Sequence, residues 1–128
     1  MAVPAMNGLD DIRNKAQEIL RNGNLRSLLI SNSSGQLILS VGQTTSDDNS
    51  AVSMLTELVQ TVWQVGHEWL KEEVAGVEIS FASQDVTLFL EPPFCIALIR
   101  ERDADRANAP LEKSDLEELI NALQEELT

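Results

Sequence analysis

Residues Ser50–Lys71, with the sequence SAVSMLTELVQTVWQVGHEWLK, decide the fold. The stretch contains no proline and one glycine, Gly66. At about 100° per residue, its apolar side chains gather on one side of a helix, whereas Thr56, Gln60 and His67 fall on the polar side. The apolar arc spans about 180°, and a surface helix needs only about 100° to cover one face of a sheet. We therefore predict a long amphipathic helix with more apolar surface than one sheet covers.

Two rows divide this apolar arc. The first row recurs by fours and threes, which is the spacing of two helices that pack side by side. Its members are Ala51, Leu55, Leu58, Val62, Val65 and Trp69. The second row contains Val52, Val59, Trp63, Gly66 and Leu70. Two rows predict two neighbours, the sheet of the same chain and a second copy of the helix.

The length of the chain weighs against the alternative, a central helix buried between a sheet and other helices of one chain. In 128 residues, little chain remains to cover a second face of the helix. The same length suits one ordinary domain over residues 1–128, whose core is large enough to fold without disulfide or metal staples. No internal repeat or linker divides it.

The net charge of −12 limits the classes of partner. Nucleic-acid binding depends on basic side chains that neutralise phosphates, so no nucleic-acid partner is expected. The same charge disfavours anionic membrane surfaces, and the apolar runs are too short to span a bilayer, so no membrane insertion is expected. A basic protein partner stays open, although such a charge often serves solubility alone.

Cys95, the single cysteine, lies inside an apolar run, which predicts a buried, reduced thiol and a cytoplasmic protein. The first residues lack the basic and apolar regions of a signal peptide. We expect residues 1–7 to form a flexible leader.

Apolar spacing and turn residues predict the remaining elements. A first helix is expected over residues 8–22, with Asn7 as its cap and Gly23 as its stop. A last helix begins at Ser114–Glu117, a capping box in which the serine and the glutamate satisfy each other's free amides. Alternating or continuous apolar runs predict five strands, at residues 26–31, 36–41, 77–81, 86–90 and 94–99.

Polar segments join these strands. The first two strands form a hairpin across residues 32–35, and residues 83–85 form a short turn between the third and fourth strands. Residues 100–110 are expected to be a mobile charged loop. The resulting order, α-β-β-α-β-β-β-α, predicts an α+β fold with a five-stranded antiparallel sheet whose faces the helices share.

This order, with the hairpin sequence NSSGQLIL at residues 32–39 leading into a long amphipathic helix, resembles the roadblock/LC7 family. Members show an N/D-x-x-G-x-x-I/V hairpin, and Asn32, Gly35 and Ile38 occupy the matching positions. The likeness covers residues 9–100. It implies a five-stranded antiparallel sheet sandwiched by helices, in a profilin-like layout.

The resemblance also implies a homodimer or paired heterodimer, built on the second helix and the third strand, with the sheet continuing across two chains. The expected interface residues are Leu55, Leu58, Val59, Val62, Val65, Trp69, Val77, Ile79 and Phe81. Family members are non-catalytic platforms, namely dynein light chains, scaffolds for Ras-like GTPases and bacterial partners that stimulate GTP hydrolysis. The implied function is to regulate or scaffold a small Ras-like GTPase. The alternative is a structural adaptor subunit, like a dynein light chain, without a GTPase partner.

No catalytic, cofactor-binding or metal-binding residues are predicted. The only histidine, His67, and the only cysteine, Cys95, would pair only if the strand presented its thiol at the polar edge of the helix. Together they are too few for a zinc site, and Asp47 and Asp48 are better explained as helix caps than as calcium ligands. No phosphate-binding loop motif occurs, so the chain is not expected to bind nucleotide itself.

Three arginines lie in the predicted charged loop. Arg100, Arg102 and Arg106 suggest an arginine finger that reaches into a GTPase site. Their acidic neighbours give a simpler explanation, which is charge balance within the loop. A third hypothesis, a small enzyme or ligand-binding domain, is disfavoured because the sequence offers no polar constellation.

Overall fold

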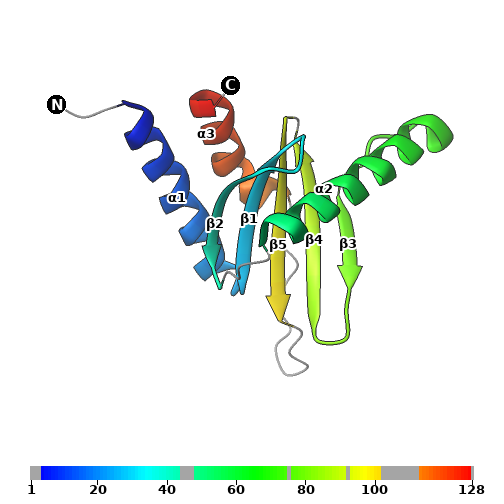
Figure 1. The fold of residues 1–128 in the computed structure, drawn as a ribbon, viewed down its shortest axis with the longest axis horizontal. Coiled ribbons are helices and arrows are strands. Elements are labelled where there is room, and N and C mark those ends of the chain that lie inside the picture. Colours follow the sequence, from blue (N-terminus) through cyan, green and yellow to red (C-terminus); the bar gives the residue numbers. More distant parts are fainter. Residues whose placement is uncertain (1–3, 44–47, 75, 92, 102–112, 128) are drawn as a thin grey trace.

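The computed structural model describes residues 4–43, 48–74, 76–91, 93–101 and 113–127. Its helices and strands are α1 (Pro4–Asn22), β1 (Ser27–Asn32), β2 (Leu37–Gly42), α2 (Asp48–Val65), β3 (Val77–Ser80), β4 (Gln84–Glu91), β5 (Phe94–Glu101) and α3 (Glu117–Leu127). A π-helical turn, η1 (Gly66–Leu70), continues α2, and a 3₁₀ turn, η2 (Lys113–Leu116), precedes α3. The predicted order and the α+β class are confirmed (Figure 1).

The five strands form one sheet in the order β2-β1-β5-β4-β3, and every neighbouring pair is antiparallel. β5 lies at the centre, between β1 and β4, although these two strands are far apart in the sequence. β3 lies at one edge, as the sequence predicted for residues 77–81, and β2 lies at the other.

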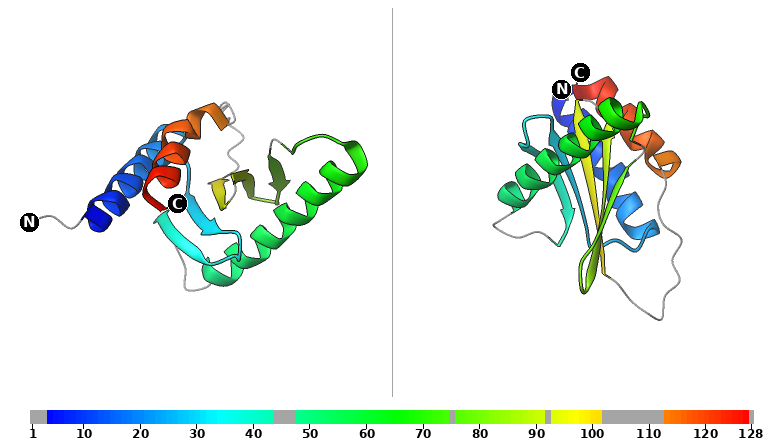
Figure 2. Two further views of the ribbon diagram at one scale, coloured as in Figure 1. Left: turned by 90° about the horizontal axis from the view of Figure 1, so that it is seen from above. Right: turned by 90° about the vertical axis from the view of Figure 1, so that its right-hand side faces the viewer.

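The helices cover the two faces of the sheet unequally (Figure 2). α1 and α3 pack together on one face, over a core in which Ile12, Leu119 and Leu123 are fully buried against Leu28 and Ile96. α2 lies alone on the other face. Its core contains Leu29, Val52, Val59, Val86, Leu88, Cys95 and Ala97. The apolar side of α3 is therefore domain core.

α2 crosses its face of the sheet obliquely, over β2, β1, β5 and β4, and its C-terminal end extends past β3 (Figures 1 and 2). Only the first part of the helix therefore rests fully on the sheet. None of the helices in the described ranges combines the length and the apolar content that a bilayer crossing requires.

The β1–β2 hairpin places its tip against α2. The side-chain oxygen of Asn32 accepts hydrogen bonds from the backbone amides of Ser34 and Gln36, at 2.9 and 3.0 Å. Gly35 has a φ of +83°, a conformation that side chains rarely tolerate. Gln60 of α2 donates from its side chain to the carbonyl of Ser33 at 2.8 Å. The asparagine and the glycine of the hairpin thus form the turn, and the turn is tied to α2 through Gln60.

The first helix starts earlier than predicted. α1 begins at Pro4, so Asn7 lies inside the helix and does not cap it, and the expected leader overlaps the first turn. Proline is common in the first turn of a helix, because a backbone N–H there has no acceptor within the helix and its absence costs no hydrogen bond. The sequence rule placed the start at the first apolar residue and therefore missed this turn. Residues 1–3 lie outside the described residues.

Two strand ends also differ from the prediction. β4 begins at Gln84, so Gln84 and Asp85 are not turn residues but pair with Glu101 and Arg100 of β5. β5 accordingly runs to Glu101 and takes in the start of the predicted charged loop, whereas residues 102–112 lie outside the description. Backbone pairing extends both strands beyond their apolar residues, and apolar spacing carries no signal for it.

Candidate functional site

The candidate site is the part of α2 that nothing in the described chain covers. Met54, Leu58, Val65 and Trp69 have exposed fractions of 70%, 42%, 48% and 81%. They follow one another at intervals of four, seven and four residues, so they lie along one side of the helix. At about 1.5 Å per residue, this exposed strip is roughly 22 Å long. It contains Leu58, Val65 and Trp69 of the row that the sequence assigned to a second helix, with Met54 added.

The other predicted row faces the sheet. Val52 and Val59 are 2% and 1% exposed, and both belong to the core beneath α2. Val59 therefore lies within its own chain and offers no surface to a partner, although it stands among the expected interface residues. Trp63 and Leu70 share this row but are exposed, and both belong to the C-terminal part of the helix and its η1 extension.

Leu55 and Val62 belong to the first predicted row but are half-buried. Leu55 packs against the core of its own chain and still presents part of its side chain to solvent. Both expected interface residues therefore border the exposed strip and widen it. Met54 and Leu70 were missing from the expected interface, yet both lay on the predicted apolar arc, which was the signal for them.

Thr56 corrects the predicted division of α2. The sequence placed it on the polar side, but its side chain is 2% exposed and lies between the helix and the sheet. Its hydroxyl is 3.0 Å from the hydroxyl of Ser31, which is also buried. Cys95, directly opposite Ser31 in the β1–β5 ladder, completes the cluster. A threonine can be buried here because the sheet supplies a hydrogen-bond partner for its oxygen.

Cys95 is a free, buried thiol, as predicted. Burial raises the pKa of the Cys95 thiol, and hydrogen bonds from Thr56 and Ser31, which lower it, offset only part of that rise. The thiol therefore stays protonated at neutral pH and is a poor nucleophile. His67 lies on the exposed η1 turn, stacked on Trp63 with ring centroids 5.2 Å apart. The structure does not bring the histidine and the cysteine together.

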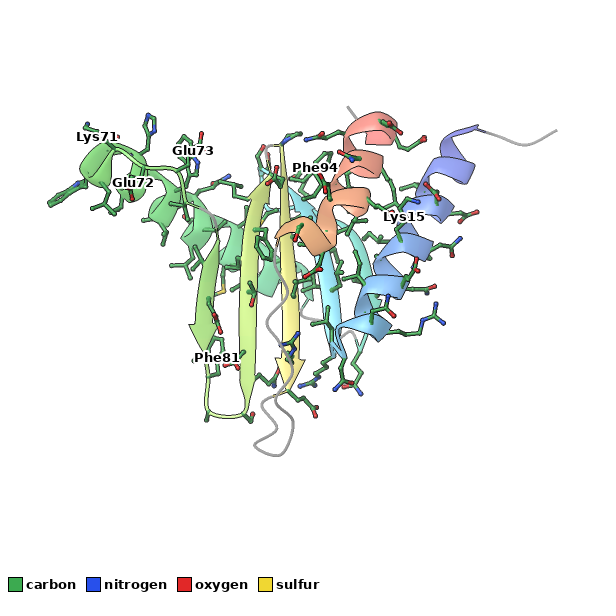
Figure 3. All side chains as sticks on the ribbon, turned by 180° about the vertical axis from the view of Figure 1, so that it is seen from behind. Lys15, Lys71, Glu72, Glu73, Phe81 and Phe94 are labelled. Carbon is green, nitrogen blue, oxygen red and sulfur yellow. The ribbon has the colours of Figure 1, made fainter. Side chains whose placement is uncertain are left out.

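The η1 turn forms the projecting end of the helix. Lys71 closes it with a left-handed φ of +59°, and the amide of Glu72 donates to the carbonyl of Gly66 at 3.2 Å. Figure 3 shows Lys71 and Glu72 at this end, past β3, and Phe81 at the opposite end of β3. Trp69 thus stands on a turn that projects beyond the domain.

β3 continues the exposed apolar surface. Val77 and Ile79 are half-buried and pack on the α2 side of the sheet, and Phe81, just after the strand, is 52% exposed. In the described chain β3 pairs only with β4, so the backbone groups on its outer side have no strand beside them. An unpaired edge strand is a ready template for pairing with another chain.

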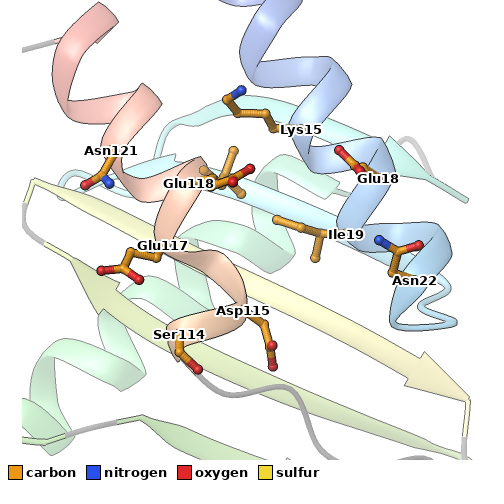
Figure 4. Close-up of a pocket in the computed structure, with 10 residues that line it drawn as sticks. Lys15, Glu18, Ile19, Asn22, Ser114, Asp115, Glu117, Glu118 and Asn121 are labelled. Atoms are coloured by element: carbon orange, nitrogen blue, oxygen red, sulfur yellow. The ribbon is translucent and has the colours of Figure 1, made fainter.

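A hollow between α1 and α3 offers a different kind of surface (Figure 4). Its volume is about 430 Å³, and Glu18, Asp115, Glu117 and Glu118 line it together with one basic residue, Lys15. Lys15 also pairs with Asp11, one turn earlier, at 3.4 Å. Across the described residues, no three histidine, cysteine or acidic side chains are grouped to hold a metal ion. The hollow is therefore an acidic surface feature.

Arg100 is not on a mobile loop. It belongs to β5, and its guanidinium donates to the carbonyl of Gly23 at 3.2 Å. The residue is thus tied to the end of α1 and is a poor candidate for an arginine finger. Arg102 and Arg106 lie outside the described residues.

Comparisons with known proteins find the same fold. No family model matches the sequence, and no curated protein sequence does. Among solved structures, MglB of Myxococcus xanthus is 17% identical, with a TM-score of 0.75 over 90% of this chain and 93% of that chain. A roadblock/LC7 domain from Streptomyces avermitilis is 15% identical, with a TM-score of 0.66 over 80% and 85%. An MglB with a tetrameric arrangement is 13% identical, with a TM-score of 0.78 over 99% and 95%.

These likenesses concern the backbone, since fewer than one residue in five is shared. They cover 80–99% of this chain. The chain has the roadblock/LC7 fold.

Proposed function

We propose that the protein is a non-catalytic, homodimeric interaction module that regulates or scaffolds a small Ras-like GTPase. The observation that carries the proposal is the exposed strip of α2 beside the unpaired edge of β3. Contiguous exposed apolar surface on a chain of this kind marks a site of interaction with another protein. Every residue of the strip is uncharged, although the chain carries a net charge of −12.

A second copy of the chain fits this surface best. Two-fold dimers use one patch on both subunits, so the patch must complement itself. A strip repeated at helical intervals satisfies this condition, because two copies of α2 can lie side by side in opposite directions. The edges of two β3 strands would then pair and satisfy their outward backbone groups. The tetrameric arrangement of one MglB structure supports assembly by copies of this fold.

The regulatory role rests on the family resemblance and on the fold shared with MglB and a roadblock/LC7 domain. The composition also supports a non-catalytic role, since the chain has one histidine and one cysteine and lacks a phosphate-binding loop motif. A partner with its own catalytic machinery would supply the chemistry. The dimer would bind and orient the switch regions of that partner.

Paired charge substitutions test the dimer. Leu58→Glu with Val65→Glu places two carboxylates in the strip, and we expect a folded monomer at micromolar concentration. Thr61→Glu with Gln64→Glu is the matched control, because it adds the same charges to exposed positions on the polar side of α2. The control should stay dimeric by light scattering, with unchanged helical circular dichroism in both variants. A strip variant that remains a dimer would remove α2 from the interface.

Nucleotide dependence separates the GTPase hypothesis from the adaptor alternative. The purified protein is immobilised and incubated with lysate from the source cells, loaded either with GDP or with a non-hydrolysable GTP analogue. We expect one Ras-like GTPase to be retained in one nucleotide state and released when the nucleotide is exchanged. Recovery of the same set of structural proteins in both states, with no GTPase among them, would favour the adaptor subunit.

A further inference from the structure

Thr56 differs from every other side chain on the sheet side of α2. Among the described residues of the helix, it is the only polar one that is buried. Its neighbours in the core beneath α2 are aliphatic, with Val52 one turn before it and Val59 one turn after. Thr56 lies over the centre of the sheet, where β1 and β5 pair and Ser31 stands opposite Cys95.

We propose that the buried hydrogen bond between Thr56 and Ser31, beside the Cys95 thiol, sets the register of α2 on the sheet. This register fixes how far the helix projects past β3 and hence where the exposed strip stands. The inference rests on the proposed function, because the strip is the proposed dimer surface. Thr56 and Ser31 are therefore positioning residues and touch no partner themselves.

Aliphatic packing alone selects the register weakly. Val52 and Val59 are the same residue two turns apart, so a helix displaced along its axis exchanges one aliphatic contact for another. Such contacts are non-directional, and aliphatic cores tolerate rearrangement when their volume is kept. A hydrogen bond between two hydroxyls, 3.0 Å long here, requires both oxygens to lie within a narrow range of distances and angles.

Any shift of α2 along its axis would cost free energy at Thr56 and Ser31. The hydroxyls of Thr56 and Ser31 would both remain buried but would lose each other, and an unsatisfied buried polar group costs more than a satisfied one contributes. Fixing the register of packed helices is the best-attested role of buried polar groups. The contact of Gln60 with Ser33 lies one turn further along the helix and is exposed. The C-terminal end of α2 and the η1 turn project from the part of the helix that Thr56 anchors.

The test measures the stability of the protein by urea unfolding and the register of α2 by methyl resonances. Thr56→Val keeps the shape but leaves the buried Ser31 hydroxyl with only the weakly hydrogen-bonding Cys95 thiol, so the urea midpoint of unfolding should fall. Adding Ser31→Ala removes that hydroxyl, and the midpoint should recover. In the double variant, the methyl resonances of Val52 and Val59 should split or broaden through exchange between registers. The dimer dissociation constant should rise about tenfold, the factor that one buried hydrogen bond represents.

Two control variants make the measurement specific. Thr61→Val is the same change on an exposed position of the same helix, where the hydroxyl bonds only to the carbonyl of Glu57. It should leave one set of methyl resonances and the wild-type dissociation constant. Thr56→Ser keeps the buried hydroxyl and should also keep one register. If the double variant does not fold, Ser31→Ala alone is read out in the same way.

The methyl spectra decide the outcome. One sharp set of Val52 and Val59 resonances in the double variant, as in the wild type, would overturn the proposal and show that aliphatic packing sets the register. The spectra do not require a dimer. A monomeric wild type would therefore refute the proposed interface while the register is still decided by the resonances.

Discussion

Gly42 ends β2 in a backbone conformation that other residues rarely adopt, with a φ of +91°. A β-carbon at this position would also lie 2.3 Å from the carbonyl oxygen of Arg26, a backbone atom that cannot move aside alone. We predict that Gly42→Ala lowers the free energy of unfolding by about 2 kcal/mol. Urea unfolding measures this loss. Gly76→Ala is the comparison, because its β-carbon meets the nearest atoms at 3.3 Å and should cost less. Equal stability of both variants would contradict the account of Gly42.

The buried thiol of Cys95 predicts that the free energy of unfolding falls at alkaline pH. Burial raises the pKa of its thiol in the folded protein, so the unfolded chain ionises first as the pH rises. From about pH 8.5 upward, the folded state binds more protons than the unfolded state, and the free energy of unfolding must fall. The loss is at most about 1.4 kcal/mol per pH unit.

Urea unfolding between pH 7 and pH 10, with Cys95→Ala as the reference, isolates this contribution, because the reference keeps all other titrating groups. The wild type should lose more stability than Cys95→Ala over this range. Parallel curves would show that the thiol is not held protonated by the fold.

Thr56 shows where single residues escape sequence analysis. A helical wheel sorts side chains by polarity, and polarity predicts exposure only when no buried partner is at hand. Ser31 is 25 residues away along the chain and reaches Thr56 only after β1 and α2 have packed together. The apolar arc of α2, by contrast, follows from local spacing alone, and Leu58, Val65 and Trp69 of its first predicted row are exposed.

At the scale of elements, the edge strand β3 makes the second half of the proposed interface testable. The amide of Phe81 donates to the carbonyl of Gln84 in the β3–β4 hairpin, at 2.8 Å. Since inward and outward amides alternate along an antiparallel strand, the amide of Glu78 points away from β4.

Glu78→Pro removes this outward amide, and proline is tolerated on an edge strand at such a position. We predict a folded protein whose dimer dissociation constant rises about tenfold or more, because one inter-strand bond is lost from each copy. Glu78→Ala keeps the amide, removes the same charge and should dimerise as the wild type does. Sedimentation equilibrium of both variants gives the constants. Equal dissociation constants would mean that the β3 edges do not pair.

Element order was predictable from the sequence, and element ends and sheet order were not. Apolar periodicity located each strand but stopped short of Gln84, Asp85, Arg100 and Glu101, which pair through their backbones. The central position of β5 depends on contacts between β1 and β5 across most of the chain. Gly66, at the start of the π-helical turn, lies so close to Val74 that a β-carbon there would be 2.7 Å from the valine methyl group, a contact that local sequence does not reveal.

For the molecule as a whole, charge and apolar surface act in opposite directions on the proposed dimer. Two copies with a net charge of −12 each repel one another, while the uncharged strip attracts. Salt shortens the range of the repulsion, to about 3 Å at 1 M from about 30 Å at 0.01 M, and does not weaken apolar burial.

We therefore predict that the dimer dissociation constant falls as sodium chloride rises from about 0.01 to 0.5 M. The strip variant Leu58→Glu with Val65→Glu should stay monomeric over the same range. Dissociation at high salt would instead indicate an interface held by ion pairs, which the uncharged strip does not provide.

The fold of the whole molecule followed from the order of its elements, whereas its partner does not follow from the fold. This chain shares its fold with an MglB structure at 13% identity, and a shared fold can carry different functions. What remains specific to this chain is its surface, namely the exposed strip, the edge of β3 and the acidic hollow between α1 and α3.

The mass of the purified protein by light scattering, followed through a dilution series, tests the central claim most directly. The account predicts a mass near twice the 14.1 kDa of one chain, persisting into the micromolar range. A mass of 14.1 kDa at every concentration would show that the strip of α2 and the edge of β3 have no partner copy, and the homodimer would be contradicted.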